Sequence, residues 1–124
     1  MNSMFTKIVR IFLGIMLVVF GLNKFLGFIP LPELPAQASS FMVSLGETGY
    51  VLKIVGVLEV LIGALLLLKK WVPFALVLLA PISINIVLFH LFLDVVGIGC
   101  ALLVFILNAM LIYKHWPSYK SLFQ

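Results

Sequence analysis

Three polar residues interrupt the apolar stretch NIVLFHLFLD, which covers residues 85–94: Asn85, His90 and Asp94. An imidazole and a carboxylate four residues apart share one face of a helix, where they can exchange a proton or bind a polar group. A lone carboxylate, Glu59, interrupts a second apolar stretch, LKIVGVLEVLIGALLLL. Ionisable side chains in apolar membrane surroundings are costly, so each is a candidate for function.

Two lysines near the ends of apolar stretches complete this polar set. The candidates for proton transfer in catalysis are Glu59 and His90, and those for ligand binding are Lys24, Lys53, Asn85 and Asp94. Titratable groups gathered in one site are typical of proton transfer and of binding polar head groups.

Each of these residues also has a structural interpretation. Glu59 can carry a proton or pair with Lys24 or Asn85, and a lysine near a helix end can extend to the membrane interface. Asn85 can join two helices through its amide. His90 can hydrogen-bond to Asp94, whose carboxylate can instead cap the next helix. The residue types alone leave both interpretations open.

Other chemistries lack the residues that they require. Haem ligation by two histidines needs facing imidazoles, but His90 and His115 are expected at opposite membrane faces. The single cysteine, Cys100, excludes dithiol chemistry. A structural zinc site takes about four ligands, and only His90, Asp94 and Glu47 are expected near one another. No metal site is therefore predicted.

The composition indicates a membrane protein. Of the 124 residues, 65% are hydrophobic and 10% charged, whereas soluble domains are roughly half apolar and a quarter charged. A chain of this length has room for four helices of about 20 residues that cross a bilayer. The prediction is a single all-α membrane domain over residues 1–124, a four-helix bundle. The net charge of +4 is assigned to membrane orientation and not to nucleic-acid binding.

The apolar stretches place the four membrane helices at about residues 8–29, 48–68, 72–94 and 97–113. The first is expected to end at Pro30, Pro32 and Pro35, because proline cannot continue helical hydrogen bonding. Pro81 lies inside the third, and Asn108 of the fourth is expected to hydrogen-bond to a neighbouring helix.

Residues 30–47 form the long connection. Apolar residues within it recur with the spacing of one helical face: Ala38, Phe41, Met42 and Leu45. This pattern predicts a short amphipathic helix, ended by Gly46, that lies on the membrane surface or caps the bundle.

Basic residues flank the apolar stretches unevenly. Six are expected on one side of the membrane: Lys7, Arg10, Lys69, Lys70, Lys114 and Lys120. Only Lys24 and Lys53 lie toward the other side, so the positive-inside rule predicts that both termini are cytoplasmic. The first helix has no A-x-A-like cleavage site and is expected to remain attached.

The helical rise and periodicity predict where the polar set lies. Glu59 is expected roughly 15 Å from the cytoplasmic interface, Asn85 roughly 20 Å, and Lys24 and Lys53 roughly 24 Å, which places all four toward the outer half of the bundle. Glycines 49, 56 and 63 recur every seven residues, and Glu59 lies within about 60° of that stripe. Glu59 is therefore predicted to point into the bundle. Asn85 is predicted to face inward too, with a polar partner on another helix.

Three segments resemble the DoxX-like family of bacterial membrane proteins: RIFLGIMLVVFGLNKF, LKIVGVLEVLIGALLLL and LLAPISINIVLFHLFLD. The resemblance extends over about residues 8–115. It implies a four-helix protein of the bacterial inner membrane. It also implies an association with quinone or redox chemistry, because the family takes its name from the membrane subunit of a thiosulfate:quinone oxidoreductase.

Three hypotheses of function follow. In the first, the chain is a redox subunit that binds a quinone in the outer half of the bundle and works with a membrane or extracytoplasmic redox partner. In the second, it carries a small solute or a lipid, and Glu59 couples that movement to protons. In the third, it is a non-catalytic assembly partner whose buried polar residues fix helix register.

Overall fold

Helices make up all the regular structure in the part of the chain that the computed structural model describes, residues 3–27 and 33–124. The long helices are α1 (Ser3–Leu26), α3 (Val51–Leu68), α4 (Val72–Leu93) and α5 (Ile98–Lys114), and the connection holds a shorter one, α2 (Ala36–Glu47). Short 3-10 turns are η1 (Val95–Gly97), η2 (Trp116–Ser118) and η3 (Lys120–Phe123). The all-α architecture predicted from the sequence, with its one extra short helix, is confirmed.

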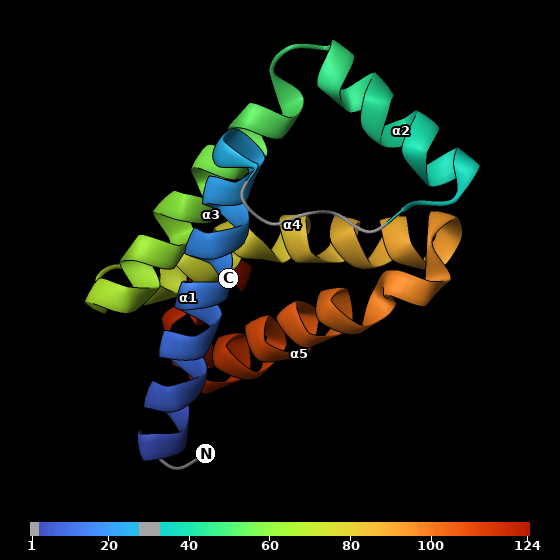
Figure 1. The fold of residues 1–124 in the computed structure, drawn as a ribbon. Coiled ribbons are helices and arrows are strands. Elements are labelled where there is room, and N and C mark those ends of the chain that lie inside the picture. Colours follow the sequence, from blue (N-terminus) through green and yellow to red (C-terminus); the bar gives the residue numbers. More distant parts are fainter. Residues whose placement is uncertain (1–2, 28–32) are drawn as a thin grey trace.

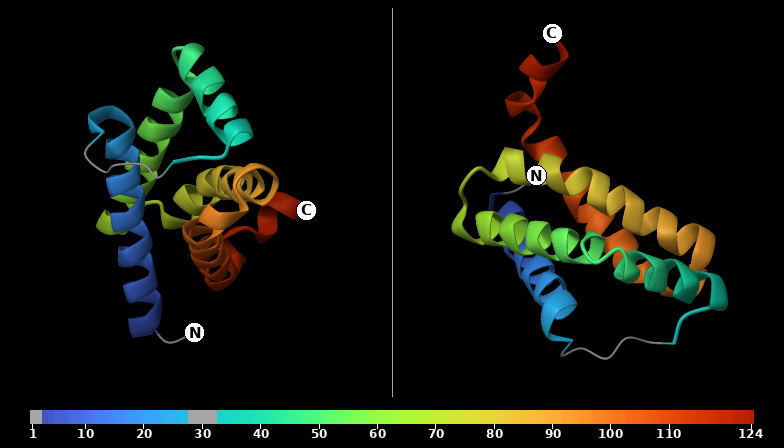
Figure 2. Two further views of the ribbon diagram at one scale, coloured as in Figure 1. Left: turned by 45° about the vertical axis from the view of Figure 1, so that its right-hand side comes forward. Right: turned by 90° about the horizontal axis from the view of Figure 1, so that it is seen from above.

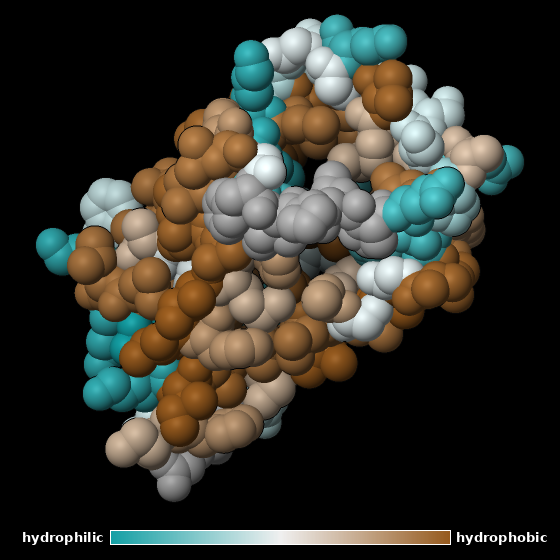
Figure 3. All heavy atoms as spheres, in the orientation of Figure 1, coloured by the Kyte–Doolittle hydropathy of each residue, from teal (hydrophilic) through white to brown (hydrophobic). Residues whose placement is uncertain are grey.

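Four helices are long and apolar enough to cross a membrane, the last formed by η1 and α5 together. At about 1.5 Å per residue, the 18 residues of α3 extend roughly 27 Å, close to the hydrocarbon thickness of a bilayer. Figure 3 shows hydrophilic surface over α2 and beside the end of α3, with hydrophobic surface between them. We call the end with the α3–α4 turn and residues 115–124 the terminal face, and the opposite end the α2 face.

The long helices associate in two pairs, α1 with α3 and α4 with α5 (Figure 1). Figure 1 shows the pairs diverging toward the α2 face, and the left view of Figure 2 shows α2 between the ends of α3 and α4. Helix α2 contacts both α3 and α4, and the rings of Phe41 and Phe89 lie 5.7 Å apart between α2 and α4. The short helix therefore connects the two pairs where they diverge.

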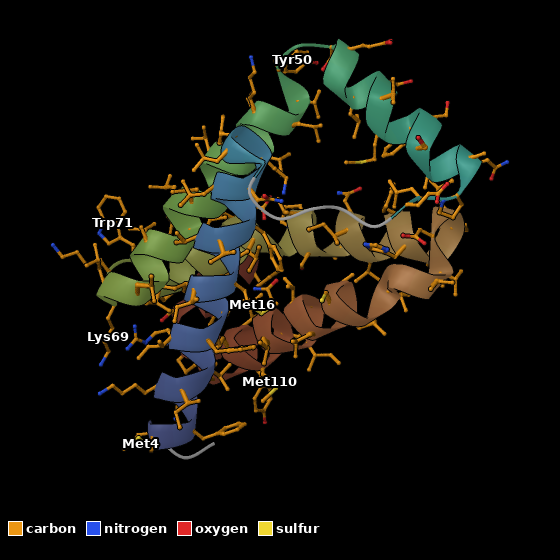
Figure 4. All side chains as sticks on the ribbon, viewed as in Figure 1. Met4, Met16, Tyr50, Lys69, Trp71 and Met110 are labelled. Atoms are coloured by element: carbon orange, nitrogen blue, oxygen red, sulfur yellow. The ribbon has the colours of Figure 1, made fainter. Side chains whose placement is uncertain are left out.

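The apolar core lies toward the terminal face. Its members are Val9, Leu13, Leu17, Ile62, Leu66, Val72, Ala75, Leu76, Leu79, Val104, Leu107 and Leu111. Met16 and Met110, labelled in Figure 4, pack against this core from α1 and α5. Toward the α2 face, the buried residues of the long helices are small or polar: Gly21, Gly56, Glu59, Ser83 and Ala101. Beyond the core, the described part of the long helices therefore buries no large apolar side chain.

Two helix boundaries differ from those expected. Helix α1 begins at Ser3 and ends at Leu26, because Gly27 adopts a φ of 61° that breaks the helix before the prolines. Pro30 and Pro32, which were expected to end this helix, lie outside the described residues.

The α2–α3 boundary is set by a later glycine than predicted. Helix α2 continues through Gly46 to Glu47, and the chain turns at Gly49, whose φ is 81°. Gly49 therefore belongs to this turn and not to the glycine stripe of α3. The amphipathic pattern of α2 holds in part, since Ala38 is fully buried whereas Phe41 remains 44% exposed.

The turn between α3 and α4 is closed by Lys69, which adopts a left-handed conformation with φ 56°. Lys70 N–H donates to the Leu65 carbonyl at 3.0 Å and Lys69 N–H to the Leu66 carbonyl at 3.3 Å, the pattern of a Schellman motif. The buried Arg10 guanidinium of α1 also donates to the Leu66 carbonyl. Arg10 thereby joins α1 to the end of α3, a role that its position in the sequence did not reveal.

Candidate functional site

Close packing of glycines brings α1 and α3 together. A Cβ added to Gly14 would lie 3.1 Å from the Gly63 carbonyl oxygen, and one added to Gly21 would lie 2.8 Å from that of Gly56. Small residues at these positions allow the two backbones to approach as membrane helices do at their tightest contacts. The glycine stripe of α3, apart from Gly49, is confirmed.

This contact places two charged residues side by side. Glu59 follows Gly56 by three residues, and Lys24 follows Gly21 by three, so both lie on the α1–α3 interface. Lys24 Nζ is 2.5 Å from Glu59 Oε1. The contact is that of an ion pair, because Glu59 Oε1 has no well-aligned hydrogen-bond donor among the described residues. The prediction that Glu59 points inward is confirmed, and of the two pairing partners considered for it the structure has Lys24.

The two members of the pair differ in exposure. The Glu59 side chain is 3% exposed, whereas that of Lys24 is 26% exposed. The Lys24 side chain is therefore partly accessible, while the carboxylate is enclosed. The apolar core lies on the terminal side of Glu59. In such an arrangement Lys24 can donate a hydrogen bond to a polar group, and the neighbouring Glu59 carboxylate can accept a proton.

A second polar pair lies at the α2 face. His90 Nδ1 is 3.5 Å from Asp94 Oδ2 and 3.2 Å from the Asp94 carbonyl oxygen. Gly97 makes this approach possible, since a Cβ there would lie 2.8 Å from Asp94 Oδ2. The Asp94 side chain makes no capping hydrogen bond to η1 or α5. The predicted contact between His90 and Asp94 is confirmed, and the alternative in which Asp94 caps the last helix is wrong.

A shallow hollow adjoins this pair, lined by Glu33, Leu34, Pro35, Asp94, Val96 and Gly97. Glu33 therefore lines the same hollow as Asp94. No group of three histidine, cysteine or acidic side chains in the described ranges is placed to hold a metal ion. The hollow can bind a polar group at the membrane surface, but it does not reach the Lys24–Glu59 pair through any of its lining residues.

Two predicted site residues lie apart from these pairs. Lys53 is exposed on α3 near the α2 face. Asn85 is also exposed, and its amide donates to the Pro81 carbonyl of its own helix at 2.8 Å. The prediction that Asn85 faces the bundle interior with a partner on another helix is wrong. An asparagine can bond the carbonyl four residues earlier in its helix, and this local bond supplies the partner.

The interhelical amide is Asn108. Its Nδ2 donates to the Leu76 carbonyl of α4 at 3.1 Å, and Ser83 Oγ donates to its Oδ1 at 3.0 Å. This network lies beside Pro81, whose ring prevents the regular hydrogen bonding of that helical turn. Asn108 therefore links α4 and α5 as expected. The buried Ser83 completes this hydrogen-bond network, and the only signal for it in the sequence was the position of Pro81.

A protein-family model matches the sequence over most of these helices. The DoxX family model matches residues 5–91, from the first turns of α1 to near the end of α4, and so includes both members of the Lys24–Glu59 pair. No curated protein and no solved structure gives a significant match. The match covers more than half of the chain, and this four-helix membrane protein therefore belongs to the DoxX family.

Proposed function

We propose that this DoxX-family protein binds a quinone, or a similar apolar molecule with a polar head, in the half of the bundle near α2. The observation that carries the proposal is the Lys24–Glu59 ion pair, with its enclosed carboxylate and partly exposed lysine side chain. An intramembrane ion pair is costly to maintain and is a default candidate for function. Among the described residues of the long helices, the buried positions on the α2 side of the pair are small or polar, which leaves this half of the bundle suited to an apolar ligand.

The donors and acceptors fit a quinone head. The Lys24 ammonium would donate a hydrogen bond to a carbonyl oxygen of the ring, and Glu59 would hold a proton next to it. A bound quinone would take up two electrons from a membrane or extracytoplasmic redox partner together with two protons. His90 and Asp94, at the α2 face, would exchange protons with the aqueous phase, and Asn85 and Lys53 would contact the ligand only from the exposed surface.

The proposal also includes the membrane location and the orientation of the protein. We place the chain in a bacterial inner membrane with both termini in the cytoplasm, because six basic residues flank the terminal face and two lie toward the other side. The α2 face, with His90 and Asp94, would then be extracytoplasmic. This orientation would let a redox partner outside the cytoplasm approach the open half of the bundle.

Quinone binding and fold stability can be measured on the same preparation. We would purify the protein in mild detergent, add a short-chain ubiquinone, and quantify retained quinone and melting temperature. In Glu59→Gln, which preserves the shape of the side chain, retained quinone should fall at least about tenfold, the loss expected for a hydrogen bond to a charged group. The matched control is Glu47→Gln, an exposed carboxylate at the end of α2, and it should bind normally.

The other hypotheses give different results in this experiment. If the folded fraction of Glu59→Gln binds ubiquinone normally and only the melting temperature falls, the ion pair is structural and the proposal fails. A co-purifying protein without bound quinone would favour the assembly subunit. Lys24→Gln and Lys53→Gln form a second comparison, in which the first should lose much more quinone than the second.

A further inference from the structure

Positive charge collects at the terminal face without acidic side chains. The basic residues at this end are Lys7, Arg10, Lys69, Lys70, Lys114 and Lys120. The chain has four acidic residues, and all lie elsewhere: Glu33, Glu47 and Asp94 near the α2 face, and Glu59 in the middle of α3. The terminal face therefore carries a strong net positive charge.

The fold concentrates part of this charge at one histidine. His115 follows α5 directly, and burial lowers its pKa, as do the ammonium groups of Lys114 and Lys69. Lys114 is its neighbour in sequence, but Lys69 belongs to the α3–α4 turn. The Asn108 amide contacts Leu76 and the Tyr119 hydroxyl contacts Pro73, so the end of α5 lies beside the start of α4 and the α3–α4 turn. Figure 4 shows Lys69 and Trp71 together at this turn.

The residues after α5 are held against the same end of the bundle. Tyr119 is 4% exposed, and its hydroxyl donates to the Pro73 carbonyl at the start of α4, at 2.7 Å. The rings of Trp116 and Phe123 stack at 5.6 Å and remain 44% and 73% exposed. Partly exposed aromatic rings of this kind are typical of the headgroup level of a membrane. The cations are thus placed at the depth of lipid phosphates.

We propose that Lys69, Lys114 and His115 form a binding site for the phosphate group of an anionic phospholipid such as phosphatidylglycerol. The phosphate oxygens would accept hydrogen bonds from the two ammonium groups, while the acyl chains lie along the apolar surface of the adjoining helices. A phosphate here also offsets the two cations, so that the imidazole can take up a proton and become a third donor. A zwitterionic phospholipid brings its own cation into this positive region and binds less well.

Native mass spectrometry of lipids retained by the full chain tests the site. The purified protein is mixed in detergent with equal amounts of phosphatidylglycerol and phosphatidylcholine, and bound copies of each are counted. The wild-type chain should retain phosphatidylglycerol preferentially. The preference should fall about fivefold for each lysine removed in Lys69→Gln and Lys114→Gln, as for basic residues near an anionic surface.

The matched control removes equal charge from the same face. Lys7→Gln and Lys120→Gln alter exposed lysines on α1 and η3, and they should change the preference by less than twofold. Equal losses of the preference for phosphatidylglycerol in both sets of lysine variants would indicate a diffuse charge effect and overturn the site. A wild-type chain that retains both lipids equally would also overturn it. Complete displacement of the lipid by inorganic phosphate at millimolar concentration would also overturn a lipid site.

A second variant keeps the test independent of the lysines. Tyr119→Phe removes the hydrogen bond to Pro73 that holds the residues after α5, and it leaves every charge in place. If the placement of His115 matters, this variant should also lose preference for phosphatidylglycerol, with the α-helical circular dichroism unchanged. An unchanged preference would contradict a site built on this segment.

Discussion

Gly21 of α1 lies so close to Gly56 of α3 that a Cβ on Gly21 would be 2.8 Å from the Gly56 carbonyl oxygen and 2.8 Å from Cγ2 of Val60. The contact determines how near Lys24 and Glu59 can come, because each lies one turn beyond one of these glycines. The ion pair therefore depends on an approach of two backbones that larger residues would prevent.

Gly21→Ala should separate the two helices and destabilise the protein by about 1–3 kcal/mol, the usual cost of overpacking a close contact. The measurement is thermal unfolding in detergent. Gly46→Ala is the control, since nothing lies within 4 Å of its added Cβ and it lies inside α2. That variant should be unchanged or more stable by up to about 1 kcal/mol, from helix propensity. Equal melting temperatures for both variants would contradict the close contact.

The two asparagines of the membrane helices should respond differently to replacement by leucine. Asn108→Leu removes hydrogen bonds to Leu76 and Ser83 between α4 and α5, and should cost about 1–2 kcal/mol of stability. Asn85→Leu removes only a bond within α4 from an exposed side chain and should stay within about 0.5 kcal/mol. Chemical or thermal unfolding of both variants in one detergent checks the order. A larger loss for Asn85→Leu would indicate that Asn85 has an interhelical role.

Stability should depend on pH through His115. Burial, and then the charges of Lys114 and Lys69, hold the pKa of His115 below its ordinary value of 6.5 in the folded protein. The unfolded chain therefore takes up a proton first as the pH falls below about 6.5. The contribution to stability is present above that pH and is lost as the pH falls through the folded-state pKa.

Melting temperatures at pH 7.5 and pH 5.5, in detergent without anionic lipid, measure this effect. The wild-type chain should lose more stability between these two pH values than His115→Gln, because glutamine does not titrate. His90 is present in both proteins, so the comparison isolates the effect of His115. Identical pH dependence in the two proteins would show that His115 does not contribute.

Reporter fusions test the orientation of the bundle. A reporter placed at residue 3 and another placed at residue 124 should both indicate the cytoplasm, because the six basic residues of the terminal face favour retention on that side. A reporter inserted after Glu47, at the end of α2, should give the opposite signal. An extracytoplasmic signal from either terminus would reverse the bundle and would place His90 and Asp94 in the cytoplasm.

The sequence by itself determined the class of the fold. Apolar stretches of about 20 residues can exist in lipid only as helices, because their backbone groups must be satisfied internally. Helical periodicity and the glycines at 56 and 63 also determined that Glu59 points inward. These conclusions depend on local chemistry and on spacing along a single helix, so a correct prediction needed no knowledge of the neighbouring helices.

Only the tertiary structure decided which residues meet. Periodicity assigns Lys24 and Glu59 to inward faces, but the packing of α1 on α3 brings them within 2.5 Å. Asn85 had two possible partners, one in its own helix and one across the bundle, and the carbonyl of Pro81 is the one that it contacts. Arg10 reaches the end of α3, 56 residues further along the chain. Such pairings depend on the angle and register between helices distant in sequence, which no pattern within one helix specifies.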